Sequence, residues 1–284
     1  MLNWLDRYDN IYAKFLKELL FRVKDDNVTA IGAQLSYYLV LSIFPFLIFL
    51  LNILSYTSIA REDVLHSIIV LLPMDTQRIV SNLFIETVTT SSETLLSLGA
   101  ITGLWAASKA IMALIRILNK AYDVDETRHY LELRGMAILF TLALLLLLVI
   151  VLLTLVFGEV LGNRLFDFLG ITQNFISFWQ YFRVIISLAF MILIFALLYR
   201  FIPSIKNGRK INLKNTIPGA IFASIGWIFT STIFSYYVNN FANYGKTYGS
   251  LGGIIVLLIW LYLSSIIIIL GGEINATLWY IRNN

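Results

Sequence analysis

The sequence TYGSLGGIIVLLIWLYLSSIIIILGG, residues 247–272, contains no charged residue. A membrane-spanning helix needs about 20 mostly apolar residues to cross the ~30 Å hydrocarbon core, and this segment supplies them. Five further segments are long, apolar and either free of charge or limited to one cation: residues 27–60, 94–115, 135–158, 178–199 and 215–245. The sequence therefore predicts an all-α polytopic membrane protein, a bundle of six transmembrane helices.

The expected organisation is an N-terminal helix followed by a single membrane domain, residues 27–284. The six expected spans lie near residues 30–55, 94–116, 135–158, 179–201, 215–239 and 249–279. Residues 1–26 carry apolar side chains at three- and four-residue spacing, with Lys14, Lys17 and Arg22 between them. This pattern is typical of an amphipathic helix that lies in the membrane interface, and a helix packed against the bundle is the alternative. The connection from residue 56 to residue 93 suggests two short amphipathic helices.

Composition excludes several classes of function. Charged residues make up 13% of the chain, against about 25% in soluble domains, and hydrophobic residues make up 59%. No cysteine is present, which excludes disulfides, thiolate catalysis and cysteine-based metal sites. The net charge of +4 is compatible with an anionic membrane surface or with nucleic acid, and the distribution of cations favours the former.

The cations also predict the orientation in the membrane. If the N-terminus is cytoplasmic and six spans alternate, cytoplasmic segments hold 15 of the 21 Lys and Arg residues, outer segments hold 5, and Lys109 lies within the membrane. Positive charges accumulate on the cytoplasmic side of membrane proteins. Both termini are therefore expected in the cytoplasm.

Lys109 is the first candidate functional residue. It lies about 22 Å below the outer edge of its span at ~1.5 Å per residue, so it falls in the inner half of the bilayer. Small residues surround it, including the Gly99–Gly103 GxxxG pair. A small-residue face lets helices approach closely and favours an inward-facing lysine that binds an anionic group or pairs with an acid. The alternative is a lysine that extends its side chain to the interface.

Glu273 is the second candidate, because it directly follows the charge-free segment, within GGEINA at residues 271–276. We expect it near the inner boundary of the membrane, either facing water or tied to Lys109 or to the amides of Gln34 and Asn275. Lys109, Glu273, Gln34 and Asn275 together form the hypothetical substrate-binding set.

No pattern of an enzyme stands out. The two histidines, His66 and His129, are expected on opposite sides of the membrane, which argues against a paired-histidine metal site. The sequence has no P-loop, GxSxG or CxxC motif, and no basic patch interleaved with aromatic residues that would suit RNA. We therefore expect no catalytic residue, no metal, no cofactor and no nucleic-acid partner.

Six ordered motifs carry a resemblance that runs from about residue 25 to residue 276. They are LSYYLVLSIFP (35–45), GLWAASKAIMALIRILNKAYDVDETR (103–128), LYRFIPS (198–204), IPGAIFASIGW (217–227), YGSLGGIIVLLIWLYLS (248–264) and GGEINA (271–276). The chain resembles the YihY/BrkB family of bacterial inner-membrane proteins. The resemblance implies six transmembrane helices, residence in the bacterial cytoplasmic membrane and no established catalytic residues. The family has carried a ribonuclease BN label, which this sequence does not support.

These patterns favour a transporter or flippase of an amphipathic anionic substrate, a phospholipid or lipid-linked precursor, with membrane lipids as partners. A structural envelope scaffold is one alternative, and a membrane-embedded enzyme is another. No ATP-binding motif occurs, so transport would be passive or coupled to an ion gradient.

The orientation can be tested with reporter fusions. Fusions after residues 130, 208 and 284 are expected to report a cytoplasmic location, and a fusion near Arg78 an external one. Two discordant reporters would contradict the arrangement of six spans.

Overall fold

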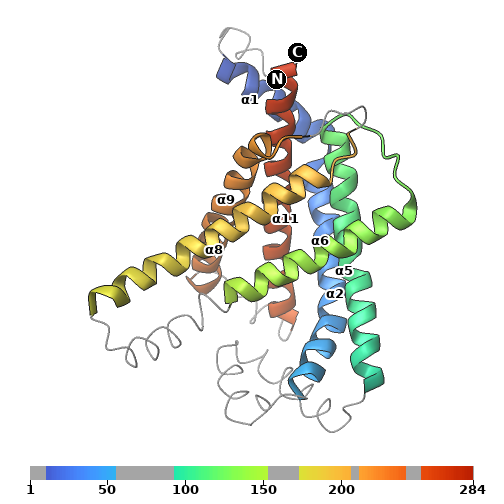
Figure 1. Ribbon diagram of the computed structural model, residues 1–284, viewed down its shortest axis with the longest axis vertical. Helices are drawn as coiled ribbons and strands as arrows, with labels where there is room; N and C mark the ends of the chain where they lie inside the picture. Colours follow the sequence, from blue (N-terminus) through green and yellow to red (C-terminus); the bar gives the residue numbers. More distant parts are fainter. Residues whose placement is uncertain (1–10, 56–92, 153–172, 206–210, 241–250, 284) are drawn as a thin grey trace. The chain divides into compact units, whose positions relative to one another are not determined.

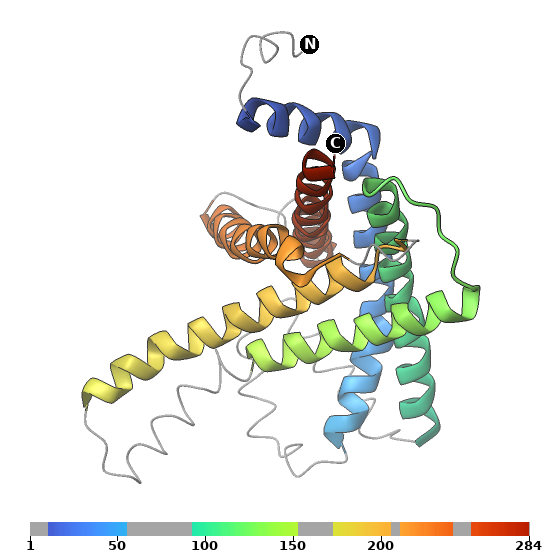
Figure 2. The same cartoon turned by 45° about the horizontal axis from the view of Figure 1, so that its top comes forward.

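The computed structural model of the chain describes residues 11–55, 93–152, 173–205, 211–240 and 251–283 (Figures 1 and 2). This part is helical and has no strand. Its helices are α1 (Ile11–Asp25), α2 (Val28–Ser55), α5 (Glu93–Ala121), α6 (Tyr130–Leu152), α8 (Gln173–Phe201), α9 (Leu213–Asn240) and α11 (Gly252–Asn283). The two helices expected within residues 56–93 lie outside the described residues.

Five of these helices are long and apolar enough to cross a membrane, and α2 contributes a shorter apolar stretch, Val28–Ile43, within the described residues. The predicted fold class, a polytopic helical membrane protein, is therefore confirmed. The predicted spans overlap α2, α5, α6, α8, α9 and α11. However, α6 and α8 begin several residues before the predicted starts, and α5 and α11 end several residues after the predicted ends.

Two residues with left-handed backbone conformation end α1 and α5. Asn27 has a φ of 51° and Asp123 a φ of 52°. Asn and Asp tolerate this conformation better than most residues, because their short polar side chains bond locally. At the first joint the amide of Asp26 donates to the carbonyl of Arg22 (2.8 Å), and Ile31 in turn donates to Asn27 (3.1 Å). The chain thus passes from α1 to α2 through a single left-handed residue.

The chain divides into two compact units. The first contains residues 1–31, 114–229 and 266–284, and the second contains residues 32–113 and 230–265. In the first unit α6 and α8 pack against each other. The core of this unit includes Leu118, Leu198, Tyr199 and Ile269, all fully buried.

Within the first unit, α9 and α11 approach each other at two glycines. A Cβ added at Gly219 would overlap the carbonyl oxygen of Gly271, and one added at Gly271 would overlap the Tyr199 hydroxyl. A Cβ at Gly272 would overlap Leu118 of α5 in the same way. Small residues let membrane helices pack backbone to backbone, and here they are required on both helices.

Asn275 ties the same two helices together. Its side-chain Nδ2 donates to the carbonyl of Thr216 (3.0 Å), and its Oδ1 accepts from the amide of Gly219 (2.8 Å). Pro218, the residue before Gly219, lies inside α9 and has no amide hydrogen to donate. Asn275 therefore satisfies backbone groups of α9 in a buried place where water cannot.

We predict that Gly219→Ala lowers the free energy of unfolding by about 1–3 kcal/mol, because the added methyl group forces α9 and α11 apart. Gly135→Ala is the matched control, because nothing lies within 4 Å of a Cβ at that helical position. The control is expected to gain about 0.5–1 kcal/mol from better helix propensity. Thermal unfolding of both variants in detergent measures the difference, and equal melting temperatures would contradict the close contact.

Candidate functional site

Arg22 anchors the end of α1 to the end of α5, and both belong to the first unit. Its side chain is buried, and it donates to the carbonyl of Ala121 (2.6 Å), to Asp123 Oδ2 (3.1 Å) and to Glu18 Oε1 (2.9 Å). Its guanidinium also lies 4.8 Å from the centre of the Tyr280 ring of α11. Burial lowers the pKa of Arg22, but hydrogen bonds and charges from Asp123 and Glu18 outweigh it and leave this pKa raised.

Lys120 holds the joint between α1 and α2. Its Nζ lies 3.1 Å from Asp26 Oδ1 and 3.8 Å from Asp25 Oδ2, and it donates to the Asp25 carbonyl at 2.6 Å. The Asp26 side chain is 5% exposed, whereas that of Lys120 is 49% exposed. The cation can therefore reach solvent while its principal acid cannot.

Glu273 of α11 is fully buried, and the residue before it, Gly272, packs against Leu118 near the same end of α5. Neither of its carboxylate oxygens has a hydrogen-bond partner among the described residues. The charges that act on it are those of Asp26, Arg22 and Lys120, and Tyr122 lies close enough to sense it. Burial is the larger cause that raises the pKa of Tyr122 above its ordinary value, and the negative charge of Glu273 raises it further.

The expected partners of Glu273 need correction. The cations that act on it are Arg22 and Lys120, rather than Lys109. The reading in which Glu273 faces water is also wrong, because its side chain is fully buried. Sequence reasoning missed Asp26, Lys120 and Arg22 as members of the site, because acids beside a helix boundary and cations on an amphipathic helix resemble a solvated surface.

Lys109 and Gln34 belong to the second unit. The Lys109 side chain is exposed and Gln34 is half-buried, so the expectation of an inward-facing lysine is wrong for the described part of the chain. The small-residue face of α5 is indeed buried, as Gly99, Gly103 and Ala110 show. Adjacent helical residues point about 100° apart, and Lys109 therefore projects away from the face that Ala110 shares with the two glycines.

Asn275, the fourth predicted site residue, is buried in the first unit. The nitrogen and the oxygen of its side-chain amide both bond to the backbone of α9, as described above. The structure therefore places Asn275 and Glu273 in the first unit, and Lys109 and Gln34 in the second.

A second polar cluster secures the segment between α5 and α6 within the first unit. Asn119 donates to Glu126 Oε2 (2.7 Å) and accepts from the amide of Ser204 (2.8 Å). Arg128 donates to both oxygens of Glu126 (2.8 and 2.6 Å) and to the carbonyl of Ile202 (2.7 Å). Burial opposes ionisation of Glu126, but the bonds from Arg128 and Asn119 outweigh it and lower the pKa to about 2.

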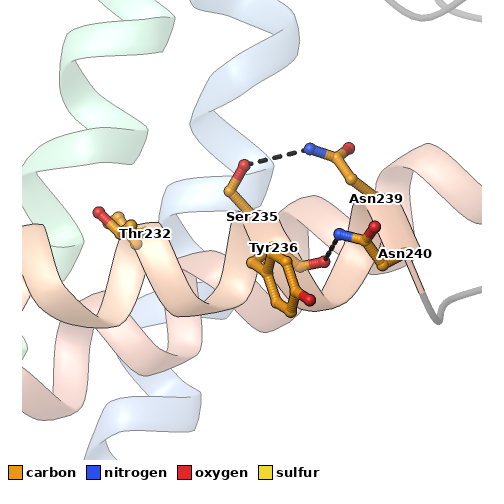
Figure 3. Close-up of a pocket in the computed structure, with 6 residues that line it drawn as sticks. Thr232, Ser235, Tyr236, Asn239 and Asn240 are labelled. Atoms are coloured by element: carbon orange, nitrogen blue, oxygen red, sulfur yellow. Dashed lines mark hydrogen bonds between the residues drawn. The ribbon is translucent and has the colours of Figure 1, made fainter.

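A shallow groove without charged residues lies along α9 in the second unit (Figure 3). It has a volume of about 510 Å³ and is lined by Ser231, Thr232, Ser235, Tyr236, Asn239 and Asn240. These residues form two rows at four-residue spacing, so hydroxyl and amide groups share one side of the helix. Asn239 donates to Ser235 Oγ (3.4 Å), Asn240 donates to the carbonyl of Tyr236 (2.7 Å), and Trp260 of α11 donates to Ser231 Oγ (3.1 Å).

Comparison with known proteins identifies the family. The family model described as virulence factor BrkB matches residues 19–284. The chain belongs to the virulence factor BrkB family. This result confirms the resemblance in the six motifs, and with the five spans it makes the protein a multi-pass membrane protein of the BrkB/UPF0761 group.

Two relatives of this BrkB-family protein match nearly its whole length. The ribonuclease-like protein YfkH of Bacillus subtilis is 43% identical over 264 residues, which is 93% of this chain and 94% of the relative. A UPF0761 membrane protein of Alteromonas mediterranea is 25% identical over 276 residues, which is 95% of this chain and 87% of the relative. No solved structure matches the protein. Among the described residues, no group of three or more His, Cys, Asp or Glu side chains could hold a metal ion.

The Glu126 cluster predicts how stability depends on pH. The pKa of Glu126 is lowered in the folded protein. The stabilisation that its ionised carboxylate contributes to folding is therefore complete above its ordinary pKa, about 4.5, and is lost as the pH falls toward about 2. Glu126→Gln is expected to lower the free energy of unfolding by about 1–3 kcal/mol at neutral pH. The stability of this variant should also decrease less than that of the wild type as the pH falls from about 4.5 to about 2. Thermal unfolding between pH 2.5 and pH 7 measures this, with Glu132→Gln, an exposed acid of α6, as the control. Parallel curves for wild type and Glu126→Gln would contradict the prediction.

Proposed function

We propose that this protein moves an amphipathic anionic substrate, a phospholipid or lipid-linked precursor, between the leaflets of the bacterial cytoplasmic membrane, with both termini in the cytoplasm. The observation that carries the proposal is Lys109, a cation exposed in the middle of the α5 membrane span, Ser97–Ala121. Among the described residues it has no ion partner, whereas Arg22, Lys120 and Arg128 each bind a carboxylate.

An exposed cation at this depth needs an anionic or aqueous partner. Insertion of an unpaired lysine at the centre of a span costs about 2.5–3.5 kcal/mol. A lipid phosphate would remove that cost, both when the lysine extends to the headgroup region and when a lipid enters beside the helix. Lys109 is therefore suited to accompany an anionic headgroup below the membrane surface.

The groove on α9 supplies polar groups without charge in the same unit. Hydroxyl and amide side chains of Ser235, Asn239 and Tyr236 line a volume of about 510 Å³ on a membrane-spanning helix. Such groups can exchange hydrogen bonds with the glycerol and phosphate oxygens of a headgroup while it leaves water. A groove without fixed charge also avoids holding the headgroup too tightly for release.

The N-terminal helix supports a site of action at the lipid headgroups. Tyr12, Leu16 and Leu20 form an exposed apolar row along α1 at four-residue spacing. Lys17 and Lys24 are exposed on the neighbouring side of the helix. An apolar row beside lysines is the pattern of a helix that lies in an anionic membrane surface.

The scaffold alternative rests on the close packing of α9 and α11, which would also suit a purely structural protein. The enzyme alternative rests on the name of the relative YfkH, which describes that protein as ribonuclease-like. A scaffold would not change the rate of lipid transfer between leaflets, and a nuclease would cleave RNA without depending on lipid.

We predict that Lys109→Ala slows transfer of a labelled anionic lipid across proteoliposome leaflets by roughly tenfold or more, the effect of losing one charge-assisted contact of ~1.5–3 kcal/mol. Lys109→Arg is expected to keep part of the activity, because the charge remains. The melting temperature should stay near that of wild type, because the side chain is exposed.

Lys214→Ala is the matched control, since Lys214 is an exposed lysine in the first turn of α9. Its transfer rate should equal that of wild type. Unchanged transfer in Lys109→Ala would remove the observation on which the proposal rests.

A further inference from the structure

The buried acids Asp26 and Glu273 form a site that lipid transfer at Lys109 does not use. Both lie in the first unit, one at the joint between α1 and α2 and the other in α11. Glu273 is fully buried and Asp26 is 4% exposed. The charge of Asp26 acts on Glu273, and the packing agrees with this, because Lys120 of α5 binds Asp26 while Leu118 of the same helix packs against Gly272, the residue before Glu273.

The packing around Glu273 excludes water. The two residues before it are Gly271 and Gly272, and the absence of their side chains lets Tyr199 and Leu118 close over the helix. Tyr199 itself donates to the carbonyl of Ile268 (2.6 Å), so its hydroxyl is not directed to the acid. Glu273 therefore cannot obtain from solvent the hydrogen bonds that it lacks.

The nearby cations are already engaged with other acceptors. Arg22 donates to Glu18, Asp123 and the carbonyl of Ala121, and Lys120 binds Asp26 and Asp25. These two cations thus already bind four acids, and Glu273 adds a fifth carboxyl group. Tyr122, the remaining titratable group close to Glu273, has a buried hydroxyl with no hydrogen-bond partner among the described residues.

We propose that Asp26 and Glu273 share one proton, so that this carboxyl pair is a proton-binding site at the joint between α1, α2 and α11. Two buried carboxylates that act on each other disfavour ionisation of both, and a buried carboxylate without hydrogen bonds is unfavourable by itself. A proton from water, bound by Glu273, gives this residue an O–H donor for the Asp26 carboxylate. Asp26 then keeps its negative charge and its ion pair with Lys120.

Loss of the proton changes the joint. Two adjacent negative charges would repel each other, and Asp26 can relieve the repulsion only by moving away from α11. Because Asp26 begins the turn into α2 and binds Lys120, that movement loosens the attachment of α1 to the end of α5. The proton therefore controls how firmly the N-terminal helix is held, and this inference does not depend on the identity of the transported substrate.

Infrared difference spectroscopy of the full-length protein in lipid nanodiscs tests the proposal. At neutral pH we expect the C=O stretching band of a protonated carboxyl group, which disappears at high pH. The band should be absent in Glu273→Gln and shifted in Asp26→Asn, which changes its hydrogen-bond acceptor. Glu126→Gln is the matched control, because Glu126 is a partly buried acid that is ionised at neutral pH and should leave the band unchanged.

Two further measurements keep the test decisive if a variant does not fold. In the wild-type protein, carbon-13 labelling of glutamate should move the band, which identifies its source as a Glu and not an Asp. At neutral pH, Glu273→Gln should melt at or above the wild-type temperature, because glutamine resembles the protonated acid. No labelled band in the wild type, or an unchanged band in Glu273→Gln, would overturn the proposal. A lower melting temperature together with either result would show an ionised Glu273 bound to the cations.

Discussion

The contact between α9 and α11 at Gly219 and Gly271 is the constraint on which the first unit depends. Backbone groups in a membrane must find partners inside the protein, and Asn275 supplies two of them to α9 from α11. This arrangement leaves no space for a Cβ at either glycine. It also determines where α11 carries Glu273, two residues after the contact, in a place closed to water.

The cations of the two units have different surroundings. In the first, Arg22, Lys120 and Arg128 bind carboxylates and main-chain carbonyls and connect helix ends. In the second, Lys109 is exposed in a span, and α9 presents a shallow groove without charged residues. The paired cations hold helices together, and the exposed one is suited to an anionic ligand. Membership of the BrkB family agrees with a location in the membrane. The proposed class of substrate follows from these side chains.

The fold was largely predictable because the signal comes from long runs without charge. Each run between residues 27 and 272 could satisfy the length of a bilayer, and each gave a helix at nearly the expected position. The site was harder to predict. Depth along a helix could be counted for Lys109 and Glu273, but the direction of each side chain depends on which helices are neighbours. Lys109 therefore projects away from the buried small-residue face, and the acid that acts on Glu273 is Asp26, which was not among the predicted site residues.

Lipid transfer by the purified wild-type protein is the most direct test of the proposed function. Proteoliposomes would carry either a labelled anionic phospholipid, phosphatidylglycerol, or a labelled zwitterionic one, phosphatidylcholine, and the rate of movement between leaflets would be compared with protein-free liposomes. We expect the protein to accelerate transfer and to favour the anionic lipid. Rates equal to those of protein-free liposomes for both lipids would contradict it.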